Sequence, residues 1–183
     1  MSKTKDLLNL HEAATHQRLM KVAAQNGAAV YPKVRVADVL QIVGSGIADD
    51  VYRFALQAHF DFVVTKGVTP IFAVEFDGPS HGAKQQRTRD EKKDEICRHL
   101  GFPLLRITSR YLPAIYRSYD LLSWCIEQWF LSQAFTEAQG RGEAPAPFFN
   151  VSNAPGTRRP RELHHGAQEP HPRRRFDILS AEF

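Results

Sequence analysis

The chain has 183 residues, 43% of them hydrophobic and 24% charged, with a formal net charge of +4 and a pI of about 9.2. This is the composition of an ordinary globular protein, and its basic excess permits nucleic-acid binding without establishing it. No apolar run approaches the roughly 18 residues of a membrane helix, and the N-terminus has no apolar signal core, so we expect no membrane partner and a cytoplasmic location. Two cysteines exclude a disulfide scaffold and a four-cysteine zinc site.

Hydrophobic periodicity predicts one α/β domain over residues 1–139. In chain order we expect a helix over 5–25, strands over 30–36, 60–65 and 71–77, a helix over 83–100, a strand over 103–107 and a helix from 113 to about 135. The last helix, opened by Pro113, is expected to turn four residues to the core, namely Ile115, Leu122, Ile126 and Trp129. Residues 37–58 stay ambiguous because Gly44-Ser45-Gly46 interrupts them.

Residues 140–183 differ in composition from the rest of the chain. They contain six of the eleven prolines, four of the eleven glycines and no lysine, which is typical of a disordered basic tail. Its clustered arginines include Arg158, Arg159, Arg173, Arg174 and Arg175. Two interpretations stay open: a solvating tail with no specific role, and a sequence-independent clamp on the phosphate backbone of nucleic acid.

The most informative region is the pair of predicted strands between residues 59 and 77. Each strand has one wholly apolar face and an acidic group at the end of its other face. A hairpin turn centred on Gly67-Val68 gives the following pairs: Thr65 with Ile71, Val63 with Ala73, Asp61 with Glu75, and His59 with Asp77. A bulge would shift this register by one residue.

The hairpin therefore gathers Asp61, Glu75 and Asp77 on one patch. Like charges that face each other across a sheet destabilise it. Either one carboxylate takes up a proton, or a cation lies between them. Clustered carboxylates are hard oxygen ligands of the kind that Mg²⁺ prefers, so the patch is a candidate metal site. The alternative is that these acids merely end the strands or face water.

The predicted helix over 83–100 brings a lysine toward this patch. Its apolar residues Ile96 and Cys97 lie three and four positions after Lys93, which puts Lys93 on the core-facing stripe, with Arg89 one turn earlier. Lys93 either extends its ammonium group to solvent or reaches the acids.

Three further residues are candidates for the same site. His81 lies four residues after Asp77 and either turns back toward the carboxylates or is a surface histidine. Arg106 lies in a strand that reads as buried, so we expect it to be paired, with an acid or with a phosphate. Glu12 lies on the first helix and is a further candidate acid.

Several stretches together carry a family resemblance. They are His59-Phe60-Asp61-Phe62-Val63-Val64, Ala73-Val74-Glu75-Phe76-Asp77-Gly78-Pro79-Ser80-His81, Arg89-Asp90, Lys93-Asp94 and Gly101-Phe102-Pro103-Leu104-Leu105-Arg106. They resemble the core of PD-(D/E)XK nucleases, and most closely a bacterial branch whose strand ends E-x-D-G-x-x-H. That pattern is related to the D-G-x-x-x-H of very-short-patch-repair endonucleases.

The resemblance implies a restriction-endonuclease-like core, a central mixed β-sheet flanked by α-helices. It also implies Mg²⁺ or Mn²⁺ as cofactor, Asp61 as the first acid and Glu75 as the second. The standard motif has lysine two residues after the second acid, where this chain has Asp77. Members that move the lysine to the following helix would make Lys93 the substitute. The repair branch relies on histidine, which would make His81 the substitute.

We therefore expect a metal-dependent nuclease that hydrolyses nucleic acid, with DNA favoured, in repair, recombination or defence. Asp61, Glu75 and Asp77 would hold the metal, and Lys93 or His81 would orient or deprotonate water.

Basic side chains would contact phosphates, with Arg89 and Arg106 joining the tail arginines. Two alternatives stay open. One is a catalytically inactive nucleic-acid-binding module on the same fold. The other is a protein-interaction module that uses Trp124 and Trp129 of the last helix, in a homodimer or with another protein.

Overall fold

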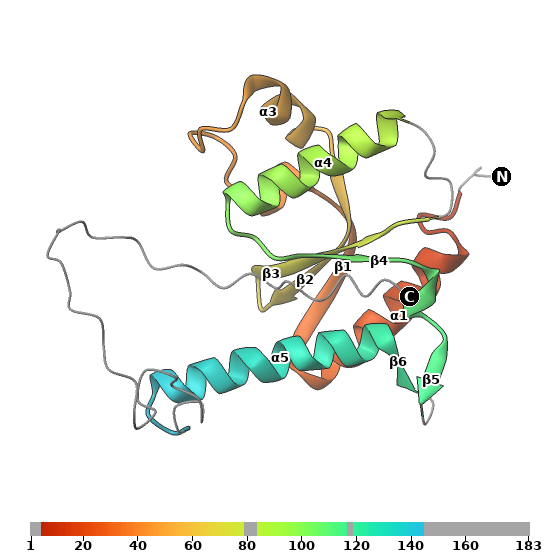
Figure 1. Ribbon diagram of the computed structural model, residues 1–183, viewed down its shortest axis with the longest axis vertical. Coiled ribbons are helices and arrows are strands. Elements are labelled where there is room, and N and C mark those ends of the chain that lie inside the picture. The colour runs from red at the N-terminus through yellow and green to blue at the C-terminus, as the bar shows by residue number, and fades with distance from the viewer. Residues whose placement is uncertain (1–4, 79–83, 117–118, 145–183) are drawn as a thin grey trace, which may run out of the picture. The chain divides into compact units, whose positions relative to one another are not determined.

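A computed structural model describes residues 5–78, 84–116 and 119–144 of the chain (Figure 1). The chain divides into two compact units, residues 1–137 and 138–183. The described part of the second unit ends helix α5 and pairs Arg141 with Glu143. Most of the predicted tail lies outside the described residues. Within these residues, no helix combines the length and the apolar character needed to cross a bilayer.

The first unit is built on a four-stranded sheet in the order β1-β2-β3-β4. Its strands are β1 (Ala28–Arg35), β2 (His59–Lys66), β3 (Thr69–Phe76) and β4 (Leu104–Ile107). The first three strands pair antiparallel, and β4 joins β3 in parallel. Because a parallel neighbour needs a crossover, helix α4 (Lys84–His99) lies between β3 and β4 in the chain. The predicted α/β class with a central mixed sheet is confirmed.

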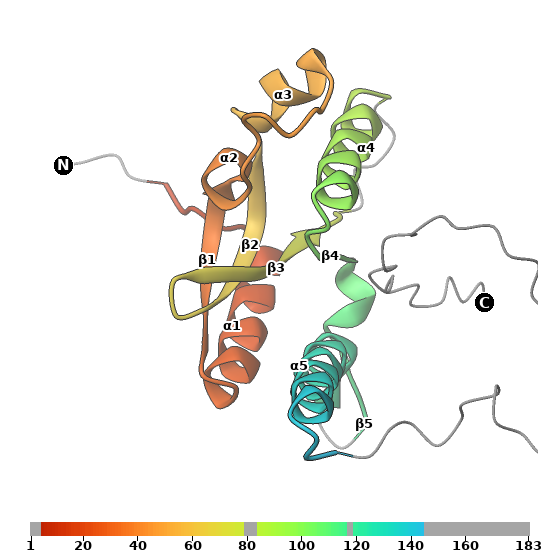
Figure 2. The same ribbon diagram turned by 90° about the vertical axis from the view of Figure 1, so that its left-hand side faces the viewer.

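Helices cover both faces of this sheet (Figure 2). On one face lie α1 (Leu10–Gln25) and α5 (Leu121–Gly140), and on the other lie α2 (Val36–Val39), α3 (Asp49–Ala55) and α4. The core against α1 and α5 includes Leu19, Val22, Phe62, Val74, Leu122 and Ile126. The core against α2, α3 and α4 includes Val36, Val51, Val63, Ala73, Ile96 and Cys97. The two central strands are thus buried on both faces, which holds their backbone firmly for the side chains they carry.

The hairpin of β2 and β3 follows the predicted register only in part. Val63 pairs with Ala73, as predicted, and the turn falls at Gly67, whose φ of 61° is the left-handed conformation that glycine adopts readily. Thr65, however, pairs with Pro70 and not with Ile71. A bulge between Val64 and Thr65 takes up the extra residue, and it leaves the acidic end of the hairpin in the predicted register.

The prediction for the last helix was wrong at its start. Pro113 opens no helix; a short 3₁₀ turn (Ser109–Tyr111) and a small hairpin, β5 (Ala114–Tyr116) and β6 (Tyr119–Asp120), precede α5. The local reason is Asp120, whose carboxylate accepts hydrogen bonds from Ser123 N at 2.8 Å and Ser123 Oγ at 2.9 Å. Such a bond satisfies a backbone N–H in the first turn, so the helix begins there.

This shift changes which predicted residues reach the core. Ile115 lies in β5 and is 72% exposed, so it is not a core residue. Leu122 and Ile126 are buried, as predicted. Trp129 packs on Phe72 with ring centroids 4.6 Å apart, whereas Trp124 is 49% exposed.

Candidate active site

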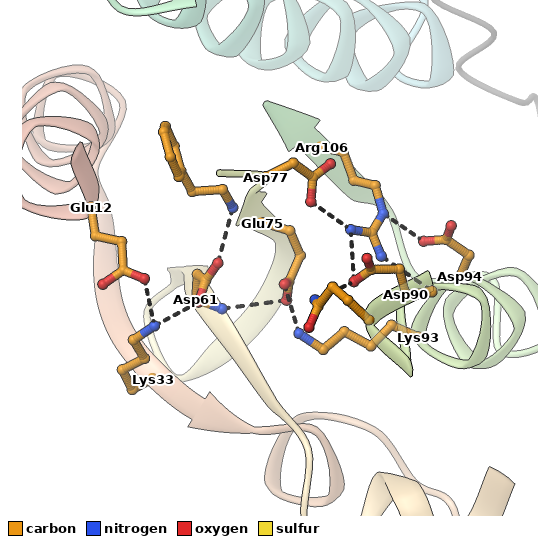
Figure 3. Close-up of polar contacts among 11 residues, drawn as sticks. Glu12, Lys33, Asp61, Glu75, Asp77, Asp90, Lys93, Asp94 and Arg106 are labelled. Carbon is orange, nitrogen blue, oxygen red and sulfur yellow. Dashed lines mark hydrogen bonds and ion pairs between the residues drawn. The ribbon is translucent and has the colours of Figure 1, made fainter. Parts of the chain in front are cut away.

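Asp61 and Glu75 lie side by side on adjacent strands, at the end of the sheet where β2 begins and β3 ends (Figure 3). Asp61 Oδ2 accepts a hydrogen bond from Phe76 N at 2.9 Å, and the backbone N of Asp61 donates to Glu75 Oε1 at 3.4 Å. Each carboxylate is therefore tied by one oxygen to the backbone of the other strand. The second oxygen of each faces a cationic side chain.

Lys93 of α4 supplies the cation for Glu75. Its Nζ lies 2.6 Å from Glu75 Oε2, and the two side chains are only 13% and 6% exposed. The helix is anchored one turn later, where Ile96 and Cys97 are buried against the sheet. The apolar stripe thus carries Lys93 inward, and its ammonium group reaches the acids rather than solvent.

Burial dominates the electrostatics of Glu75. Removal from water raises the pKa of its carboxyl to about 7, with the charge of Asp61 adding to the rise and Lys93 and Arg106 opposing it. Because the negative form of Glu75 is disfavoured here, a proton or another cation beside it is favourable. The raised pKa thus reflects mainly the burial of Glu75 and, to a smaller extent, the nearby charge of Asp61.

A lysine that the sequence analysis did not single out completes the other side of the site. Lys33 of β1 places its Nζ 2.7 Å from Asp61 Oδ1 and 2.9 Å from Glu12 Oε1. Burial opposes its charge, but its hydrogen bonds to Asp61 and Glu12 raise the pKa of Lys33 above the ordinary value. No local pattern marked Lys33, because its role depends on β1 pairing with β2.

Glu12 had a recognisable local signal. Asn9 Oδ1 accepts from Glu12 N at 2.9 Å, and Glu12 Oε2 accepts from Asn9 N at 3.0 Å, which is a capping box at the start of α1. The capping box fixes Glu12 Oε2, and Glu12 Oε1 accepts a hydrogen bond from Lys33. The candidate acid of the first helix is thus part of the site, through Lys33.

Asp77 does not join Asp61 and Glu75, contrary to the predicted three-acid patch. Its Oδ1 accepts from Arg106 at 2.9 Å. The same guanidinium also binds Asp94 at 2.9 Å and lies 3.4 Å from Asp90, both on α4. Of the two predicted kinds of partner for Arg106, an acid or a phosphate, the structure shows acids, and three of them surround the guanidinium. The guanidinium holds these acids together because it offers several donors in one plane.

The remaining predicted site residues fall in two groups. Arg89 is exposed on α4, on the same helix as Lys93. The others lie outside the described residues, namely His81, Arg158, Arg159, Arg173, Arg174 and Arg175.

Asp61 and Glu75 are the residues of this site that would hold a metal ion such as Mg²⁺ or Mn²⁺. In the described part of the chain, no three His, Cys, Asp or Glu side chains gather as a metal site. Mg²⁺ is usually bound through one or two carboxylates, with water and substrate phosphate completing its shell. Asp61 and Glu75 are such a pair, and the raised pKa of Glu75 reflects their mutual repulsion in part.

Comparison with known proteins identifies a family for most of the chain. Residues 4–119, which include every described residue of the site, match the family described as "Protein of unknown function (DUF2726)". No curated protein and no solved structure matches the chain significantly.

Proposed function

We propose that this chain, which belongs to the DUF2726 family, is a metal-dependent nuclease that hydrolyses phosphodiester bonds of nucleic acid, with DNA as the expected substrate. The observation that carries the proposal is the Asp61–Glu75 pair with Lys93 bound to it. Hydrolysis of an anionic ester needs oxygen ligands for a metal cation, which the two strand carboxylates provide. It also needs a cationic group beside the attacking water, which the lysine provides.

The local charge balance supports the need for a metal ion. When all five groups are ionised, Glu12, Asp61 and Glu75 contribute three negative charges and Lys33 and Lys93 two positive charges, which leaves one negative charge. A phosphodiester is itself an anion and would be repelled by this balance. A divalent cation offsets this negative charge and so reduces the repulsion of the substrate.

Each residue then has a defined task. Asp61 and Glu75 would hold Mg²⁺ or Mn²⁺, and the ion would lower the pKa of a bound water and offset charge on the phosphate. Lys93 stays beside Glu75 and orients water or holds a phosphate oxygen with its ammonium hydrogens. Lys93, supplied by the helix, is in this proposal the substitute for the motif lysine.

The fold is consistent with this activity. We propose that the mixed sheet between its two helical layers is a restriction-endonuclease-like core, as the resemblance implies. In support, both acids of the resemblance lie on adjacent strands, and the helix after them contributes the lysine. The proposal includes a role for this nuclease in DNA repair, recombination or defence.

The test compares cutting of supercoiled plasmid, linear duplex, single-stranded DNA and RNA in Mg²⁺, Mn²⁺ or EDTA. The variants are Asp61→Asn and Glu75→Gln, with Asp38→Asn as matched control, because Asp38 is an exposed acid paired with Arg35. We expect cutting that requires metal, is lost in both site variants and is retained in the control. Nucleic-acid binding without cutting by the wild type would point to the inactive binding module.

One observation favours a second function, that of a protein-interaction module. Trp124, Leu131 and Phe135 of α5 are 49%, 60% and 46% exposed and follow one another at helical spacing. Exposed aromatic residues of this kind are enriched at protein interfaces. The oligomeric state of the full chain and of Trp124→Gln, measured by light scattering, tests whether this face joins two copies.

A further inference from the structure

We propose that Lys33 competes with divalent cations for Asp61, so that a cation binds only by displacing the Lys33 ammonium group. This inference rests on the proposed function, since it concerns how the same site is loaded. It assigns a regulatory role to a residue that lies on a different strand from both acids.

The backbone at Lys33 is the first indication. Its φ is 55°, and no other non-glycine residue in the described part of the chain has a positive φ. Residues with a Cβ rarely adopt this conformation, and strained residues in folded proteins cluster at functional sites. Here the strain lies in the middle of β1, between Pro32 and Val34, where the ladder with β2 is interrupted. The unusual conformation accompanies an ammonium group that reaches across to Asp61.

The oxygens that Lys33 binds are those that are not tied to the backbone. Asp61 Oδ2 is bound to Phe76 N, and Lys33 takes Oδ1. Glu12 Oε2 is bound in the capping box, and Lys33 takes Oε1. An ammonium and a divalent cation favour the same carboxylate oxygen and repel each other. Their binding to Asp61 is therefore antagonistic.

Exposure decides which of the two lysines can move. The Lys33 side chain is 34% exposed, whereas that of Lys93 is 13% exposed. Lys33 also has a four-carbon stem that can swing its charge to solvent without moving the strand. Lys93 is therefore the resident cation of the site, and Lys33 is the displaceable one.

The first experiment measures binding of Mn²⁺ and of Mg²⁺ to the full chain by calorimetry. Lys33→Met keeps the apolar stem and removes the charge, and Lys66→Met is the matched control at the exposed far end of β2. We expect Lys33→Met to bind both ions at least about tenfold more tightly than wild type, and Lys66→Met to match wild type. A purely structural Lys33 would give the opposite sign, because its loss would disorder Asp61 and weaken binding.

A second measurement needs no charge-removing variant at Lys33. Wild-type protein is acetylated with an amine-reactive ester in Mg²⁺ or in EDTA, and the modified lysines are quantified by mass spectrometry. We expect modification of Lys33 to rise severalfold in Mg²⁺, that of Lys66 to stay constant, and the rise to vanish in Asp61→Asn. A rise that persists in Asp61→Asn, or no rise at all, overturns the inference.

The outcomes separate this inference from the nuclease proposal. Metal binding of equal strength in wild type and Lys33→Met overturns the role of Lys33 alone. Tighter binding in Lys33→Met without cutting of any substrate supports the role of Lys33 and overturns the nuclease. No binding by either protein overturns both.

Discussion

The Nζ atom of Lys93 lies 2.6 Å from Oε2 of Glu75, although 18 residues separate them along the chain. The contact joins a strand to the helix that follows it, and both side chains are nearly buried. Glu75 also accepts a hydrogen bond, at 3.4 Å, from the backbone N of Asp61, the other acid of the hairpin. A buried lysine and a buried carboxylate that bind each other beside a second acidic residue form a chemical unit rather than a surface ion pair.

If that unit is catalytic, Lys93→Met will lower the rate of DNA cutting by about 100-fold or more, the usual cost of removing a positioned hydrogen-bond donor. The comparison is Lys92→Met on the same helix, which removes an ion pair with the exposed Asp50. Circular dichroism checks that both variants fold. An equal effect of the two substitutions would show that Lys93 acts only through stability.

The buried carboxyl of Glu75 predicts a pH-dependent stability. Its pKa in the folded state is about 7, against an ordinary value of 4.5. Because the folded pKa is the higher one, this contribution is fully present below pH 4.5 and is lost as pH rises to 7. Its size is at most about 3 kcal/mol.

Urea unfolding of wild type and Glu75→Gln across this pH range measures the effect. We expect the wild type to lose stability toward neutral pH and Glu75→Gln to show a flatter profile. Asp50→Asn should keep the wild-type slope, because Lys92 holds the pKa of Asp50 below this range. Parallel profiles for wild type and Glu75→Gln would mean that Glu75 is ionised throughout.

The left-handed backbone of Lys33 predicts an unusual order of stability between two substitutions. Lys33→Gly and Lys33→Ala both remove the ammonium group, so they differ only at the backbone. Glycine adopts a φ of 55° without strain, and we expect Lys33→Gly to be more stable than Lys33→Ala by about 1 kcal/mol. In an ordinary strand position glycine would be the less stable of the two. Urea unfolding at a single pH decides between them.

Arg106 is predicted to stabilise the fold rather than to bind substrate. Its guanidinium joins Asp77 at the end of β3 to Asp90 and Asp94 of α4. We expect Arg106→Met to lower the free energy of unfolding by about 2 kcal/mol, because the partly buried Asp77 and Asp90 and the exposed Asp94 lose their common partner. Arg35→Met, which breaks an exposed pair with Asp38, should have a much smaller effect.

The readout that separates the two roles of Arg106 is the salt dependence of DNA binding. A side chain that contacts phosphate releases a counterion, and its loss lowers the salt slope by about 1. We expect an unchanged slope for Arg106→Met. A reduced slope with unchanged stability would restore Arg106 as a phosphate contact.

Local pattern was enough to predict the acidic pair and to put Lys93 on the core-facing side of its helix, but it left open whether the ammonium group of Lys93 reaches the acids. Alternation along two short strands and a two-residue turn bring Asp61 opposite Glu75, and the bulge near Thr65 does not disturb that end. Helical spacing from Ile96 places Lys93 on the inner face of α4. These relationships act over one hairpin or two helical turns, so side-chain periodicity determines them.

Local pattern misled where a competing contact decided the outcome. Asp77 shares a strand with Glu75, yet Arg106, which lies 29 residues further along the chain, binds it. Pro113 is a good first residue for a helix, yet Asp120 caps α5 seven residues later. Asp77 is bound by a distant residue, whereas the helix start is set by the local capping of Ser123 by Asp120.

The contacts of Lys33 with Glu12 and Asp61 depend on the tertiary structure. Lys33 is 21 residues from Glu12 and 28 from Asp61, and it meets them only because β1 pairs with β2 while α1 packs on the sheet. Strand pairing and helix packing depend on how two hydrophobic cores close on opposite faces of the sheet, a property of the whole domain. Local periodicity in the sequence therefore determined the acidic pair and the helix face of Lys93. The contact of Lys93 with Glu75 and the approach of Lys33 to Asp61 were decided by tertiary packing, because both join separate elements.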